Sequence, residues 1–111
     1  MKICTNFKDR LIGNMFRKEI IDMCFPNCNS VHTFFMKKPI DIYMTDKNYK
    51  ILFIFKRVKP SKIILPKRNV FYTIETTIDK YNFKENEIFD EKKVQFWTFI
   101  FLPNSLNNHL N

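Results

Sequence analysis

Glycine is almost absent from this chain, since Gly13 is the one glycine among 111 residues. Turns that need a positive φ must therefore use Asn, Asp or Lys, and Asn tolerates the left-handed region best. Long apolar runs are missing too, because the longest, residues 94–102, is far shorter than the roughly 18 residues that span a bilayer. Residues 1–10 contain no apolar run, so we expect no signal peptide, no membrane partner and a cytoplasmic protein.

Cysteine is also scarce, and in a cytoplasmic protein we expect the three cysteines to be reduced. Cys24, Cys28 and His32 follow one another at intervals of four residues. This spacing resembles a metal site only loosely, because structural zinc sites usually combine a C-x2-4-C pair with a second pair of ligands in tetrahedral geometry. No fourth ligand is evident, so we expect no metal and no cofactor. Buried thiols are the favoured interpretation, and a redox-labile pair of Cys24 and Cys28 is the alternative.

The composition is typical of a single globular domain covering residues 1–111. Hydrophobic residues make up 45% of the chain and charged residues 27%, which separates it from disordered chains. Thirteen Phe, four Tyr and one Trp supply a large apolar area for this length. A hydrophobic core can therefore close without disulfides or metals.

Acidic residues are missing from one stretch, between Asp46 and Glu75, and the whole chain has a net charge of +8. Six basic residues of this stretch form a candidate nucleic-acid-binding face: Lys56, Arg57, Lys59, Lys62, Lys67 and Arg68. A basic face indicates an anionic partner. This hypothesis requires the six side chains to share one face, and the alternative is a solvated surface with no partner.

Short apolar segments between turn residues predict a domain built mostly of strands. The expected strands cover residues 31–36, 40–44, 49–58, 63–65, 69–74 and 87–89. Helical spacing over residues 8–21 predicts one or two short helical turns, capped by Asn6 or Asp9, and a further short helix is expected over residues 76–84. The expected fold class is α+β, a mostly-β, barrel-like or sandwich-like small domain with one or two short helices.

The C-terminal stretch, residues 94–102, is apolar on both alternating faces. A strand of this kind must be buried on both sides. It could serve as the contact between two copies of the chain, and the sequence leaves the oligomeric state open.

Several motifs resemble one known family. DRLIGNMFR at residues 9–17 is similar to that family's ER…GLMFR opening. The central block resembles its FPNC…IHTFFM…PIDV pattern, through FPNC at 25–28, VHTFFM at 31–36 and PIDI at 39–42. The KP and LP pairs at 59–60 and 65–66 and the strand at 70–75 also match. On these residues the chain is identified as a member of the DUF192 family, a domain of unknown function, over about residues 7–88.

The resemblance implies a small α+β domain with a barrel-like set of strands, and it implies no reaction, because the family has none established. Residues from about 92 to 111 are an extension outside the family pattern. The chain also lacks two glycines of that pattern, near Thr76 and at Asn86. We expect Asn86 to take the left-handed conformation and the turn after Glu75 to be rebuilt.

The densest motifs supply the leading functional hypothesis. The chain is expected to be a non-catalytic binding module with a pocket or groove for an anionic small molecule or a protein partner. The candidate ligand-binding residues are Arg17, His32, Phe35, Met36 and Asp41. Arg17 would bind the anionic group, and the alternative is a structural ion pair between Arg17 and Asp41.

A small hydrolase-like enzyme is a further hypothesis. His32 would act as the general base and Asp41 would orient it. The nucleophile would come from Cys28, Ser30 or Thr33. Any chain of this size offers such a trio, so the sequence favours a protein without catalytic activity.

Overall fold

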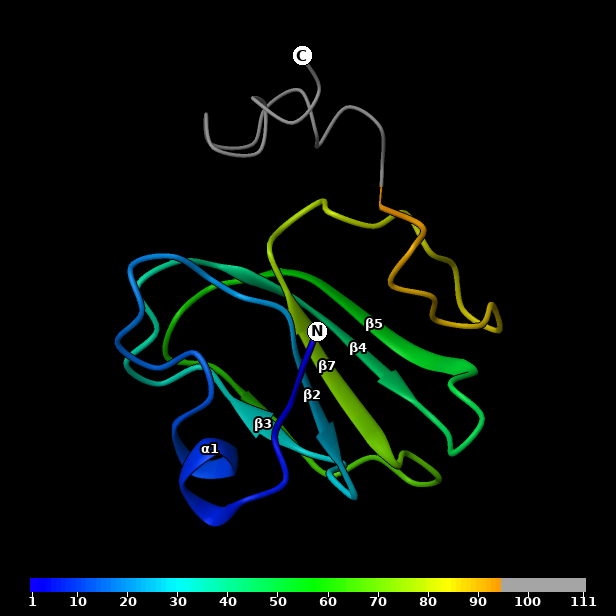
Figure 1. Ribbon diagram of the computed structural model, residues 1–111, viewed down its shortest axis with the longest axis horizontal. Helices are drawn as coiled ribbons and strands as arrows, with labels where there is room; N and C mark the ends of the chain where they lie inside the picture. Colours follow the sequence, from blue (N-terminus) through cyan, green and yellow to red (C-terminus); the bar gives the residue numbers. More distant parts are fainter. Residues whose placement is uncertain (95–111) are drawn as a thin grey trace.

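The chain folds around an open five-stranded sheet, as seen in the computed structural model, which describes residues 1–94 (Figure 1). Its strands lie in the order β1 (Lys2–Ile3), β2 (Met23–Pro26), β7 (Tyr72–Thr76), β4 (Ile40–Thr45) and β5 (Ile51–Val58). The first two run parallel and the other neighbours antiparallel. A second sheet pairs β3 (Val31–His32) with β6 (Ile63–Ile64), and the helix α1 spans Phe7–Ile12.

The mostly-β, α+β class expected from the sequence is therefore confirmed. Barrel closure is not found in the described part of the chain, because β1 and β5 are the two edges of the large sheet. No helix among residues 1–94 has the length and apolar character needed to cross a bilayer.

The hairpin of β4 and β5 is the best predicted element. The polar turn between the strands is closed by Asp46, whose carboxylate accepts hydrogen bonds from the N–H groups of Asn48 and Lys50 at 2.9 and 3.0 Å. An Asp at this position favours a turn because its side chain mimics a backbone acceptor. The turn leaves Tyr49 at a φ of 63°, so β5 begins two residues later than Tyr49, at Ile51.

Alternate side chains of β4 divide the core into two layers. Ile40, Ile42 and Met44 pack with Met36 and with Ile64 of β6, so the small sheet covers this face. On the opposite face Tyr43 packs against three aromatic rings of the segment that follows β7: Tyr81, Phe83 and Phe89. The arrangement is sandwich-like, with a two-stranded sheet on one face and an aromatic loop on the other.

One predicted strand is only partly formed and one predicted helix was wrong. The strand expected over residues 31–36 ends at His32, because a turn follows in which Met36 donates its N–H to the carbonyl of Thr33 at 3.2 Å and Phe35 adopts a φ of 62°. The helix expected over residues 76–84 is a turn, since Asp79 has a φ of 58°.

Other predicted boundaries were shifted. The helical segment ends at Ile12, the strand expected at 69–74 runs over Tyr72–Thr76, and the last expected strand is a single bridge between Lys50 and Ile88. The prediction for residues 94–102 falls almost wholly outside the described residues.

Candidate functional site

Gly13 determines the backbone path of the segment that follows α1. Asn6 caps the helix, because its side-chain oxygen accepts the N–H of Asp9 at 2.8 Å. Gly13 then ends the helix with φ 51° and ψ −126°. A Cβ here would meet Cζ of Phe25 at 3.1 Å, so both the backbone angle and the space favour glycine. The single glycine therefore lets the next residues pass close over the sheet.

Phe16 and Phe35 form an exposed aromatic pair. Their ring centroids lie 5.4 Å apart and the ring planes differ by 26°. The N–H of Phe16 donates to the carbonyl of Phe35 at 3.0 Å, which joins the two loops. Both residues have a positive φ, of 65° and 62°, and the side chains are 60% and 64% exposed. Bulky residues seldom adopt this conformation, and it places two large apolar rings in solvent.

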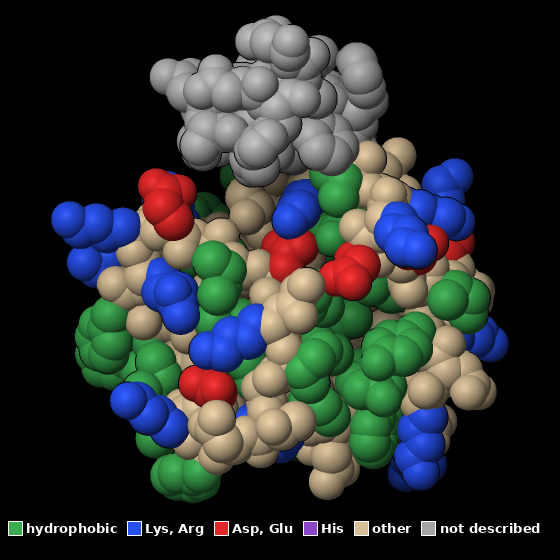
Figure 2. Space-filling view, viewed as in Figure 1, with side chains coloured by type: hydrophobic (Ala, Val, Ile, Leu, Met, Phe, Trp, Pro, Cys, Tyr) green, Lys and Arg blue, Asp and Glu red, His purple; other side chains and the backbone are tan. Residues whose placement is uncertain are grey.

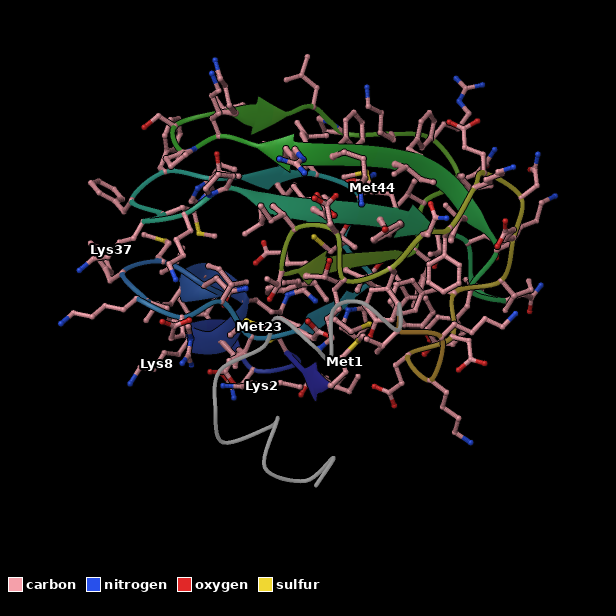
Figure 3. All side chains as sticks on the ribbon, turned by 90° about the horizontal axis from the view of Figure 1, so that it is seen from above. Met1, Lys2, Lys8, Met23, Lys37 and Met44 are labelled. Atoms are coloured by element: carbon pink, nitrogen blue, oxygen red, sulfur yellow. The ribbon has the colours of Figure 1, made fainter. Side chains whose placement is uncertain are left out.

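Phe16 is part of a groove of about 330 Å³ alongside α1, which we call the α1 groove. Its lining residues are Lys2, Lys8, Asp9, Ile12, Gly13, Met15, Phe16, Arg17 and Met23. Asp9 is already bound by Lys2 at 3.3 Å and by the Asn6 amide at 2.9 Å. Lys8 and Arg17 form no ion pair with any described residue, so the groove carries uncompensated positive charge. Figure 3 shows Lys8 and Lys37 extending outward at the α1 end of the molecule.

Glu75 and Asn14 meet beneath the same segment. Glu75 lies on β7 and is 4% exposed, and one of its oxygens accepts the Asn14 side-chain N–H at 2.9 Å. Asn14 also bonds the backbone of Ile21, donating to its carbonyl at 3.1 Å and accepting its N–H at 3.2 Å. Burial raises the pKa of Glu75 to about 7, although the Asn14 hydrogen bond opposes this rise.

Asp41 occupies a different place from the one expected. It points to the aromatic face of the sheet and binds Lys56 at 2.5 Å. Its carboxylate also accepts the backbone N–H groups of Arg57 at 2.8 Å and Asp79 at 2.7 Å. The proposed ion pair with Arg17 is therefore not formed. A buried carboxylate that joins β4, β5 and the turn after β7 has a sufficient structural role.

His32 lies on the opposite side of the large sheet from Asp41, in the small sheet that covers the other face. Its Nδ1 accepts the N–H of Phe34 at 3.2 Å, and its ring stacks on that of Phe34 at 5.1 Å. The structure thus does not bring the proposed acid–base pair together. The hydroxyl of Thr33, one proposed nucleophile, is buried and donates to the carbonyl of Lys59 at 2.7 Å.

Cys24, Cys28 and His32, the three residues considered as metal ligands, do not come together as a metal site. Within residues 1–94 no group of three His, Cys, Asp or Glu side chains is placed to hold a metal ion. Cys24 is in the core with a pKa that burial raises to about 11, while the Cys28 thiol donates to the carbonyl of Ser30 at 3.1 Å. A thiol with a raised pKa is a poor nucleophile at neutral pH.

The six basic residues of the candidate nucleic-acid-binding face point to different sides. Lys56 lies over the Tyr43 ring on the aromatic face, whereas Lys67 lies over Phe53 and Phe55 on the other. Lys56 and Arg57 are also ion-paired, Lys56 with Asp41 and both with Asp79. Figure 2 shows Lys and Arg side chains dispersed between apolar areas rather than gathered together. The requirement of one shared basic face is not met.

Sequence reasoning missed Asn14 and Glu75 as site residues. Both stand inside motifs that carry the family resemblance, at residues 9–17 and 70–75, but the sequence pattern pointed only to Arg17, through its charge. The sequence did offer one signal. Glu75 is an acidic residue at the end of an apolar strand, and acidic residues are rarely buried unless they have a specific role. Of the expected site residues, His32 and Met36 line the same cavity as Glu75, Arg17 lines the α1 groove, and Phe35 stacks on Phe16.

Comparisons with known proteins agree on a family without an assigned activity. The DUF192 model, described as "Uncharacterized ACR", matches residues 1–96. A UPF0127 protein of Pyrococcus horikoshii is 32% identical over 81 residues, which cover 68% of this chain and 70% of that protein.

Two crystal structures share the fold at low sequence identity. One is a protein of unknown function from Novosphingobium aromaticivorans, with a TM-score of 0.59, 17% identity, and coverage of 68% of this chain and 60% of that chain. The other, from Sinorhizobium meliloti, is described as a proposed transcription regulator; it has a TM-score of 0.60, 19% identity, and coverage of 68% and 66%. At this identity the likeness establishes the fold alone.

Proposed function

Because the chain belongs to the uncharacterized DUF192 family, we propose its function from its own geometry: a non-catalytic binding module for an anionic small molecule that carries an aromatic ring. The site is the α1 groove together with the Phe16–Phe35 pair. The observation that carries the proposal is the presence of an exposed, stacked aromatic pair directly beside cations without an acidic partner.

The charges of the α1 groove favour an anion. Asp9 is satisfied by Lys2, which leaves Lys8 and Arg17 to bind a ligand. A guanidinium suits phosphate and carboxylate groups because its donors form a planar fork that can bind two oxygens at once. At about 330 Å³ the groove lies at the lower end of the range for small-molecule sites.

The aromatic pair favours a flat ring in the same ligand. Phe16 and Phe35 each keep more than half of the side chain exposed, so an outer ring face is open for stacking. Their left-handed backbones cost about 1–3 kcal/mol each, and strain of this kind concentrates at functional sites. The pair is thus held in a position that core packing alone does not require.

Nucleoside monophosphates combine these two chemical features, so AMP is the first probe. NMR titration at low ionic strength should show saturable shifts at residues 15–17 and 35. Adenosine and inorganic phosphate, each offering half of the ligand, should bind more weakly. Salt should weaken AMP binding because the cations are exposed.

Variants locate the site. Arg17→Gln and Phe16→Leu should each weaken AMP binding by roughly tenfold, the usual scale for a lost charge-assisted bond or a lost stacking contact. Lys84→Gln is the matched control, since it removes one exposed positive charge far along the chain from the groove. Equal losses of AMP affinity in Arg17→Gln and Lys84→Gln would show that net charge alone accounts for the effect, and would refute the proposal. Much tighter binding of oligothymidylate than of AMP would instead favour a nucleic-acid partner.

A further inference from the structure

A second cavity lies beneath the segment that forms the α1 groove. Its volume is about 90 Å³. The lining includes the apolar side chains of Phe25 and Met36 and the polar groups of Asn14 and Glu75. The two sites share residues 12, 13 and 15 as a common wall, but different charged groups line them, with Glu75 in the cavity and Lys8 and Arg17 in the α1 groove. Because the ligand-binding groups differ, binding in this cavity does not depend on the function proposed for the α1 groove.

Glu75 is an incompletely satisfied acid. A carboxylate that is 4% exposed normally has several hydrogen bonds or a cationic partner, because burying an isolated charge is very costly. Within residues 1–94 it accepts one hydrogen bond, from the neutral amide of Asn14, and forms no ion pair. Its flanking residues across the sheet, Met23 and Ile42, are apolar. The high pKa of Glu75 follows from the same surroundings.

The two basic residues of the cavity wall are engaged elsewhere. The guanidinium of Arg10 donates to the carbonyl oxygens of Pro26 and Asn27, the latter at 3.1 Å. His32 accepts the N–H of Phe34 through Nδ1 at 3.2 Å and forms no ion pair with Glu75. Neither residue neutralises Glu75. A ligand that enters the cavity therefore meets an acid with unused acceptor capacity and two apolar walls.

We propose that this cavity binds a primary ammonium group, which donates hydrogen bonds to the Glu75 carboxylate while its first methylenes pack against Phe25 and Met36. An ammonium supplies both the charge and the donors that this carboxylate lacks. The volume admits only a few non-hydrogen atoms, since a water molecule occupies about 30 Å³ of liquid. The cavity thus fits the end of an alkylamine, and an anion would face the acid at close range.

Ethylammonium is the probe that tests this assignment. Protein with ¹³C-labelled glutamate is titrated with ethylammonium chloride at pH 8, where Glu75 is ionised, and sodium chloride at equal ionic strength serves as the reference. We expect saturable shifts of the Glu75 carboxyl carbon and of the Asn14 side-chain amide. The absence of saturable shifts up to 100 mM, or stronger binding of acetate than of ethylammonium, would overturn the proposal and indicate a solvent-filled cavity around a protonatable acid.

Matched variants separate this cavity from general charge effects. Glu75→Gln keeps the side-chain shape and should weaken ethylammonium binding by at least about tenfold. Glu85→Gln removes an exposed acid and should leave binding unchanged. Equal binding by wild type and Glu75→Gln would refute the assignment. The carboxyl-carbon titration needs no variant, so it decides the question even if Glu75→Gln folds poorly, and AMP binding at the α1 groove reports separately on that site.

Discussion

Replacing Glu75 with glutamine should change how stability depends on pH. Burial raises the pKa of this carboxyl from an ordinary 4.5 to about 7 in the folded protein. The folded chain therefore binds more protons than the unfolded chain between these values, so the free energy of unfolding falls as pH rises through this window. Integrated from pH 4 to pH 8, the loss from this one group is about 3 kcal/mol.

The Glu75→Gln variant should lack this loss. Urea denaturation followed by far-UV circular dichroism, repeated from pH 4 to pH 8, gives both curves. Between pH 4 and pH 8, the free energy of unfolding of the variant should rise by about 3 kcal/mol relative to that of the wild type. Glu85→Gln, which removes an exposed acid, should run parallel to wild type. Parallel curves for Glu75→Gln would show that the Glu75 carboxyl is not desolvated, and the reasoning on the buried acid would fail.

Three further substitutions test the supports of the site by urea denaturation. Gly13→Ala should destabilise the protein by about 1–3 kcal/mol, since φ is 51° and the new Cβ meets Phe25; wild-type stability would show that the segment shifts freely. Asp41→Ala should cost about 3–5 kcal/mol because it leaves Lys56 and two backbone N–H groups without their acceptor; a cost under 1 kcal/mol would place that carboxylate in solvent. Thr33→Val should cost about 1–3 kcal/mol through lost hydroxyl bonds, and a neutral result would mean that water replaces them.

The scarcity of glycine predicted part of the backbone well. Asn27, Asn69 and Asn86 all adopt a positive φ, as Asn was expected to do, and Asn86 stands where the family pattern has glycine. Phe16 and Phe35 do the same without any local signal in the sequence. Their conformation is set by tertiary contact between two loops, and a propensity for single residues cannot anticipate it.

The strands were more predictable than the site. Apolar segments between turn residues define β4 and β5, and the side-chain period of two residues places successive residues of β4 in the two core layers. The site depends on contacts between residues far apart in sequence, such as Asn14 with Glu75, which are 61 positions apart. Charge patterns did not reveal them, since a buried acid and an exposed one look alike in a linear sequence. The same limit explains why Arg17 was paired with Asp41.

The carboxylate of Asp41 also bears on how the molecule opens. It ties the turn at Asp79 to β4 and β5, and that turn leads into the segment that brings Tyr81 and Phe83 over Tyr43. Loss of this acceptor would weaken one attachment of the aromatic cover, which the Lys80–Asp22 ion pair and the Lys50–Ile88 bridge also hold in place. In native-state hydrogen exchange the amides of Arg57 and Asp79 would then exchange together, as members of one cooperative subglobal unit. The Asp41 carboxylate would thus be one of several attachments that the cover must lose before it opens.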